Sequence, residues 1–198
     1  LSGSTVDFTG ATLTGPVGKL NVLVEGEANQ SVNLADFAFD QMVVSKTAGD
    51  VVWGAGFTAD KFTCVAVSAM AQTFAAGNRI ILRELLLDGS GDGAAKNLTL
   101  VSSEPETAWK LKVTQFASVI GVTVSDSDAS ESAVVIYADQ PSQDSGRNRN
   151  WTFTRSRATW LGGSGDFTDP AKWSSGEVPD VSTLVIVESN AAINVVGD

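Results

Sequence analysis

The chain of 198 residues contains no histidine and only one cysteine, Cys64. Without histidine there can be no Ser-His-Asp or Cys-His catalytic arrangement and no histidine-liganded metal site. A single cysteine cannot close an intrachain disulfide, and the apolar stretch Phe62–Val67 around it predicts a small buried side chain rather than a reactive thiol. These classes of enzyme and metal site are therefore excluded.

Basic residues are also scarce, because 13 Lys and Arg stand against 23 Asp and Glu, a formal net charge of −10. Such a charge repels nucleic acids and anionic membrane surfaces, so we expect neither as a partner. The densest basic stretch, Arg147 to Arg157, is interrupted by Asn and Thr and predicts a solvated loop. No apolar run is long enough to cross a bilayer, and the first residues lack the plan of a signal peptide. We expect a mature or excised chain.

Short runs of Val, Leu, Ile and Thr, bounded by Gly, Asn, Asp and Ser, recur through the chain, and no stretch sustains a helical period. This pattern predicts an all-β fold. Strand-like segments followed by a turn return at a spacing of roughly twenty residues, the length of one solenoid coil; they are Leu20–Val24, Gln41–Ser45, Phe62–Ala66 and Ile80–Glu84. Stacked coils would bury one continuous interior, which favours a right-handed parallel β-helix (solenoid) over the alternative, a β-sandwich.

Two longer motifs carry a family resemblance. The segments Ser118–Ser130 (SVIGVTVSDSDAS) and Asn148–Phe153 (NRNWTF) resemble the closing coils of bacterial extracellular right-handed parallel β-helix repeat proteins. The segment from Thr159 (TWLGGSGDF) to Asp180 (VPD), with Trp173 inside it, resembles the unit that opens the next repeat block. The resemblance implies a secreted bacterial protein, with a β-helix over residues 1–154 and a continuation or capping segment of that helix over residues 155–198.

In size and overall character the chain also resembles the β-helical, xylan-binding class of carbohydrate-binding modules attached to bacterial xylanases. This resemblance implies a non-catalytic module that binds plant cell-wall polysaccharide, with xylan as the expected ligand, and targets an attached secreted glycoside hydrolase. The repeat-like start at Thr159 favours the alternative, a structural or adhesive β-helix segment of a bacterial cell-surface protein.

Paired carboxylates are the remaining catalytic candidates. Asp126 and Asp128 are two residues apart, a spacing that places both side chains on one side of an extended strand. They lie, however, in a Ser/Asp-rich turn, where such side chains bond neighbouring backbone amides, and Glu104 and Glu106 lie in a loop around a proline. We therefore predict that the chain is not an enzyme and needs no cofactor.

The stretch from Asp88 to Gly93 imitates the first half of a calcium-binding loop, with Asp88 and Asp92 as oxygen ligands. The match fails at Thr99, where such a loop requires a bidentate glutamate. The sequence predicts a glycine-rich turn here and no metal site, although whether calcium binds near Asp88 and Asp92 is left open.

Aromatic side chains are the candidate binding residues, because sugar rings pack their C–H faces on exposed aromatic rings. Tyr137 alternates with apolar neighbours and is expected to face outward. Trp109 shares the phase of Leu111 and Val113 and is expected in the interior or at a coil edge, whereas Trp53 shares the phase of Val51, which favours a core role over a binding role. In stacked coils, residues one coil apart can match successive sugars, and we predict Tyr137, Trp109 and Trp53 as the polysaccharide-binding residues. Trp160 is predicted either to pack in the core or to bind sugar. Three other aromatic residues are predicted to pack inside the motifs: Trp151, Phe153 and Trp173.

Overall fold

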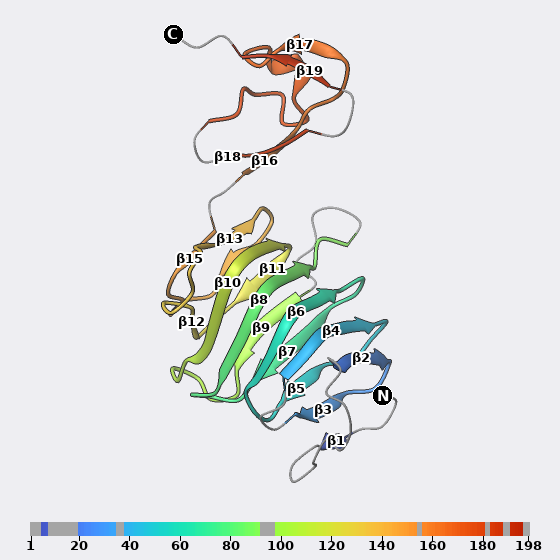
Figure 1. The fold of residues 1–198 in the computed structure, drawn as a ribbon, viewed down its shortest axis with the longest axis vertical. Coiled ribbons are helices and arrows are strands. Elements are labelled where there is room, and N and C mark those ends of the chain that lie inside the picture. Colours follow the sequence, from blue (N-terminus) through green and yellow to red (C-terminus); the bar gives the residue numbers. More distant parts are fainter. Residues whose placement is uncertain are drawn as a thin grey trace. The chain divides into compact units, whose positions relative to one another are not determined.

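The computed structural model describes residues 5–7, 20–34, 38–91, 98–153, 156–180, 183–187 and 191–195. The chain divides into two compact units, Leu1–Phe153 and Thr154–Asp198 (Figure 1), a division that falls beside the boundary expected after residue 154. Within the described ranges there are strands, turns and one short 3-10 segment, Pro170–Lys172, but no α-helix. The all-β prediction is confirmed. None of the described segments forms a helix able to span a membrane.

The strands of the first unit form two sheets in which all pairings between described strands are parallel. One sheet has seven strands, in the order β1 (Thr5–Asp7), β3 (Gln30–Asn33), β5 (Val51–Trp53), β7 (Met70–Phe74), β9 (Leu98–Ser102), β11 (Val122–Val124) and β14 (Gln143–Asp144). The other has eight: β2 (Leu20–Gly26), β4 (Ala38–Lys46), β6 (Phe57–Val65), β8 (Arg79–Asp88), β10 (Trp109–Ile120), β13 (Ile136–Asp139) and β15 (Trp151–Thr152), with β12 (Ser127–Asp128) beside β10. From β1 to β11 consecutive strands alternate between the sheets, a connectivity compatible with a β-solenoid.

The strand register aligns apolar residues from one strand of the eight-stranded sheet to the next. Val22 pairs with Met42, Met42 with Phe62, and Phe62 with Leu85. The first two steps, 22 to 42 and 42 to 62, have the expected spacing of 20 residues, whereas the step from 62 to 85 has 23. Because the connection that runs from β6 through β7 to β8 is longer, Ile80 pairs with Phe57 and not with Phe62.

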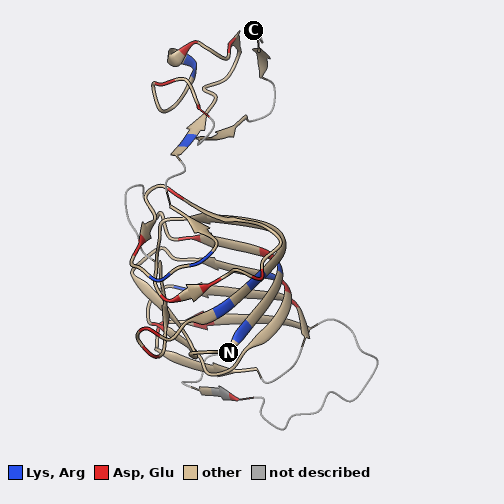
Figure 2. Cartoon of the chain, turned by 90° about the vertical axis from the view of Figure 1, so that its left-hand side faces the viewer, with Lys and Arg blue, Asp and Glu red and all other residues tan. Residues whose placement is uncertain are grey.

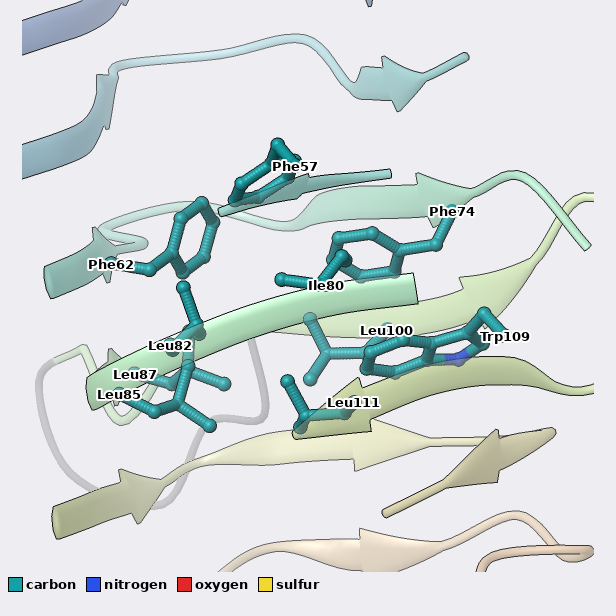
Figure 3. Close-up of a pocket in the computed structure, with 10 residues that line it drawn as sticks. All are labelled: Phe57, Phe62, Phe74, Ile80, Leu82, Leu85, Leu87, Leu100, Trp109 and Leu111. Carbon is teal, nitrogen blue, oxygen red and sulfur yellow. The ribbon is translucent and has the colours of Figure 1, made fainter. Parts of the chain in front are cut away.

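The space between the two sheets is filled by side chains from both. Figure 3 shows ten apolar residues of β6 to β10 that point toward one another in this interior. The void that they surround has a volume of about 10 Å³, which is room for one water molecule and for no ligand. Cys64 is fully buried in the same core, and this burial raises the pKa of its thiol to about 12. The interior is therefore a core rather than a binding cavity.

β10 contains a bulge opposite β8. Leu82 of β8 pairs with Val113, but Glu84 pairs with Phe116, so Thr114 and Gln115 together oppose a single residue, Arg83. Such a bulge bends a strand locally. It leaves Phe116 on the outer surface beside Glu84.

The second unit repeats the alternation of parallel strands on a smaller scale. β16 (Ser156–Thr159) pairs with β18 (Thr183–Ile186), and β17 (Ser164–Asp166) pairs with β19 (Ala192–Asn194), both in parallel. Trp160 and Trp173 are buried in its core with their rings edge to face at 5.0 Å. In the first unit Trp151 stacks with Phe153 against the main core. The packing roles predicted for Trp151, Phe153 and Trp173 are confirmed, and Trp160 is a core residue.

Candidate functional site

Two of the three predicted binding residues lie in the core of the first unit. Trp53 is 1% exposed, contacts the rings of Phe57 and Phe74, and donates from Nε1 to Oε1 of Gln72 at 2.8 Å. Trp109 is 2% exposed, stacks on Phe74 with ring centroids 4.3 Å apart, and donates from Nε1 to a backbone carbonyl oxygen at 3.2 Å. Neither ring has a free face for a sugar. Trp53 and Trp109 are therefore core residues and not the stacking residues predicted from the sequence.

Tyr137, the third predicted residue, does face outward. It is 39% exposed on β13, between Ile136 and Ala138, which are both fully buried. Strand alternation requires this arrangement, because two buried neighbours place the residue between them on the opposite face of the sheet.

Two further exposed apolar residues lie on the same outer face. Phe116 is 53% exposed and Val135 is 43% exposed. Val119 of β10 pairs with Ala138 of β13; Phe116 and Val135 each lie three residues before this pair, and Tyr137 lies one residue before it. We call Phe116, Val135 and Tyr137 the aromatic face. Phe116 was missed in the sequence, although alternation along β10 from Leu111 already places it on the side opposite the core.

A polar hollow of about 410 Å³ lies on the surface near β12 and contains the paired carboxylates considered from the sequence. It is lined by Glu106, Ala108, Asp126, Asp128, Arg147, Asn148 and Arg149. Arg147 donates from Nε to Oδ1 of Asp126 and from Nη2 to Oδ2 at 3.2 Å. Arg149 Nη1 lies 4.0 Å from Oδ2 of Asp128. The stretch that begins at Arg147, predicted to be a solvated loop, has exposed arginine side chains that supply counter-ions to Asp126 and Asp128.

Both aspartates of the hollow have surroundings that favour the ionised form. The hydrogen bond from Arg147 lowers the pKa of Asp126, and burial of this carboxylate, which is 5% exposed, opposes the shift only in part. Asp128 Oδ1 accepts from the hydroxyl of Ser130 at 2.6 Å and from its amide at 3.1 Å, and this hydroxyl is the main reason that the pKa of Asp128 is also lowered. A glycosidase needs one protonated carboxyl group as its general acid. Neither Asp126 nor Asp128 meets this requirement.

The ion pair of Asp126 is expected to make the stability of the first unit dependent on pH. Since the folded pKa of Asp126 lies below its unfolded value of about 3.9, the stabilisation is fully present above that pH and is lost as the pH falls through the folded pKa. Asp126→Asn should lower the free energy of unfolding by about 1.5–3 kcal/mol at pH 7, because a hydrogen bond between charged groups is lost. Urea unfolding at pH 7 and pH 3 should show that the difference from wild type shrinks at pH 3. An equal difference at both values would show that ionisation of Asp126 has no part in it.

The remaining polar candidates have local structural roles. Asp88 Oδ1 accepts from the amide and the hydroxyl of Ser90, at 2.9 Å and 2.6 Å, which is the geometry of a turn. Asp92, its partner in the considered calcium loop, lies outside the described residues. Within the described ranges, no group of three or more Cys, Asp or Glu residues is placed to hold a metal ion. Glu106 has a positive φ of 66° in the turn that lines the hollow.

No known protein family, characterised protein or solved structure matches this chain. The candidate site is therefore defined by the chain's own geometry. It consists of the exposed aromatic face on β10 and β13, together with the charged surface near β12.

Proposed function

We propose that the first unit is a right-handed parallel β-helix, and that the chain is a secreted, non-catalytic bacterial module that binds a xylan-type plant cell-wall polysaccharide. The observation that carries the proposal is the aromatic face, where Phe116 and Tyr137 are exposed on neighbouring strands. Aromatic rings pack against the C–H faces of sugars, while polar groups beside them bind the hydroxyls. Gln115 and Arg83, joined by a hydrogen bond of 2.9 Å, lie next to Phe116 in the bulge and supply such groups.

The strand spacing supports a polymeric ligand. An outward row of paired residues runs across the eight-stranded sheet from β2 to β10, the neighbour of the strand that carries Tyr137; it contains Leu23, Val43, Thr63, Leu86 and Ser118. Neighbouring positions in such a row are about 4.8 Å apart. This distance is comparable to one sugar unit of an extended polysaccharide, so successive sugars can meet successive strands. A polymer lying across an open face of this kind is bound along its length, and its ends remain free.

The carboxylates support a role without catalysis. Asp126 and Asp128 are paired with arginines, and their pKa values are lowered, so neither aspartate of the hollow supplies the protonated acid that glycoside hydrolysis needs. In this proposal the chain holds an attached glycoside hydrolase on the polysaccharide, and the attached enzyme performs the cleavage. Incubation of the chain alone with xylan is accordingly expected to release no reducing sugar.

Removing either ring of the aromatic face should weaken binding to xylan. Tyr137→Ala and Phe116→Ala are each expected to cost about 1–3 kcal/mol, which is about a tenfold to hundredfold loss of affinity. Affinity electrophoresis in gels that contain soluble xylan measures this loss as reduced retardation. Val52→Ala is the matched control, because Val52 is equally exposed but lies on the seven-stranded sheet. If both aromatic variants are retarded as strongly as wild type, the aromatic face does not bind xylan.

A structural or adhesive role is the second candidate, and the second unit favours it. Its parallel pairs, Ser156 with Thr183 and Ser164 with Ala192, repeat the alternating strand order of the first unit at steps of 27 and 28 residues. Such a repeat is typical of a solenoid that builds a long surface protein. If the folded wild-type chain is retarded by no soluble plant polysaccharide, this second function is the better account.

A further inference from the structure

A row of charged side chains crosses neighbouring strands near the polar hollow. In the strand register, Arg79 of β8 lies opposite Lys110 of β10, and Lys110 lies opposite Asp128 of β12. The backbone of Asp128 in turn forms a parallel β-bridge with that of Arg149. Lys112 lies two residues after Lys110 and therefore faces the same side of the strand. We call these five residues the charged row. Figure 2 shows basic positions on neighbouring strands of the first unit, whereas the chain as a whole carries a net charge of −10.

The acidic residues around the charged row do not neutralise all of its cations. Arg79 Nη2 is 2.6 Å from Oε1 of Glu131, and Arg149 lies beside Asp128. Lys110 is exposed and Lys112 is half-buried, and neither side chain makes a hydrogen bond or salt bridge with any residue in the described ranges. The positive field of Lys110 nevertheless reaches Asp128, whose pKa it helps to lower after the larger effect of Ser130.

The arrangement has an electrostatic cost that an anionic ligand would remove. Arg79 and Lys110 are direct neighbours on adjacent strands, and like charges in that position repel each other. A carboxylate bound across Lys110 and Lys112 would offset this repulsion. Asp128 and Ser130 line a second, small hollow of about 10 Å³ with the two lysines, so a sugar would lie over this hollow and not inside it, with Asp128 and Ser130 available to its hydroxyl groups.

Cations interleaved with acceptors suit a sugar acid better than a polyphosphate. A uronic acid carries one carboxylate and several hydroxyls on each ring, so it can use both kinds of group in the row. A nucleic acid carries a phosphate at every nucleotide but few hydroxyl groups, so it would use the cations of the row and leave the acceptor Asp128 without a donor.

We infer that the charged row binds the carboxylates of a uronic-acid-bearing polysaccharide, with Lys110 and Lys112 as the residues that contact the carboxylate. This inference rests on the proposed function, because it specifies the class of polysaccharide that the module holds. It predicts that acidic polymers are bound more tightly than neutral ones, and that the difference shrinks as salt screens the lysines.

The test compares neutral arabinoxylan with glucuronate-bearing xylan and polygalacturonate, using the full chain in affinity electrophoresis. Lys110→Met and Lys112→Met keep most of the side-chain stem and remove the charge. Each should reduce affinity for the acidic polymers by about twofold to fivefold and leave affinity for arabinoxylan unchanged. Lys61→Met is the matched control, because it removes one positive charge from β6 of the same sheet. The control should bind all three polymers as wild type does.

The outcomes separate the inference from the function on which it rests. If the wild type binds arabinoxylan as tightly as the acidic polymers, or if Lys61→Met weakens acidic binding as much as the other two variants, the charged row has no such role and the proposed function stands. If single-stranded DNA displaces the acidic polymers with the same dependence on Lys110 and Lys112, the charged row binds phosphate groups as well as it binds uronate carboxylates, and the inference is wrong. If the folded wild type binds neither kind of polymer, both proposals fail.

Discussion

Replacing Trp53 with alanine is expected to lower the free energy of unfolding of the first unit by about 3–5 kcal/mol. The ring is the centre of an aromatic cluster, with Phe57, Phe62 and Phe74 at centroid distances of 5.1, 5.7 and 6.4 Å. Truncation leaves a cavity that these neighbours cannot fill, and it removes the donor that satisfies the buried side-chain oxygen of Gln72. The cost is that of a core residue and not of a surface binding residue.

Urea denaturation followed by far-ultraviolet circular dichroism measures this change. Trp53→Phe should lose less stability, because a ring still occupies most of the space. The outward neighbour Val52 provides the matched control, and Val52→Ala should change the free energy of unfolding by no more than about 0.5 kcal/mol. If Trp53→Ala keeps its stability but no longer binds polysaccharide, Trp53 is a surface binding residue and its assignment to the core is wrong.

Replacing Gly121 with alanine should have a similarly large effect, for a backbone reason. Gly121 has a positive φ of 66°, and a β-carbon there would overlap the backbone of Gly89 and Ser90, where two successive turns of the first unit stack. An alanine in the left-handed region costs about 1–2 kcal/mol, and overpacking against neighbouring atoms costs about 1–3 kcal/mol more. We therefore expect Gly121→Ala to lower the free energy of unfolding by about 2–5 kcal/mol.

Gly77 separates these two contributions. Its φ of 74° is close to that of Gly121, but a β-carbon at Gly77 would meet no atom within 4 Å. Gly77→Ala should therefore show only the conformational cost of about 1–2 kcal/mol in the same denaturation experiment. Equal losses in the two variants would mean that the turns at Gly89 and Gly121 are not stacked as closely as the structure shows.

The sequence predicts the β-strands and the direction of their side chains because both follow from a local pattern. Alternation around Ile136 and Ala138 is sufficient to turn Tyr137 outward, and the same rule applied to β10 also places Phe116 on the outer face. The spacing of twenty residues predicts the alignment of Val22, Met42 and Phe62 for the same reason.

The alignment of later coils could not be predicted, because coil length varies. The step from Phe62 to Leu85 takes 23 residues, and the step from Ile80 to Leu111 takes 31. Asp126 and Arg147 are 21 residues apart, close to the regular spacing, but both have a positive φ, in turns where strand alternation gives no side-chain direction, so their ion pair could not be predicted. Strand alternation likewise shows which residues share a side with Trp109, but only the stacking of the coils shows that Phe74 covers its ring.

The central claim is that Phe116 and Tyr137 form the surface on which a xylan-type polysaccharide lies. Hydroxyl-radical footprinting of the full chain, read by mass spectrometry with and without saturating xylan, tests it most directly. The account predicts that xylan protects Phe116 and Tyr137 from oxidation, that Trp53 and Trp109 react weakly in both conditions because they are buried, and that the exposed Leu161 is modified equally in both. Unchanged oxidation of Phe116 and Tyr137 while xylan is bound would contradict the account.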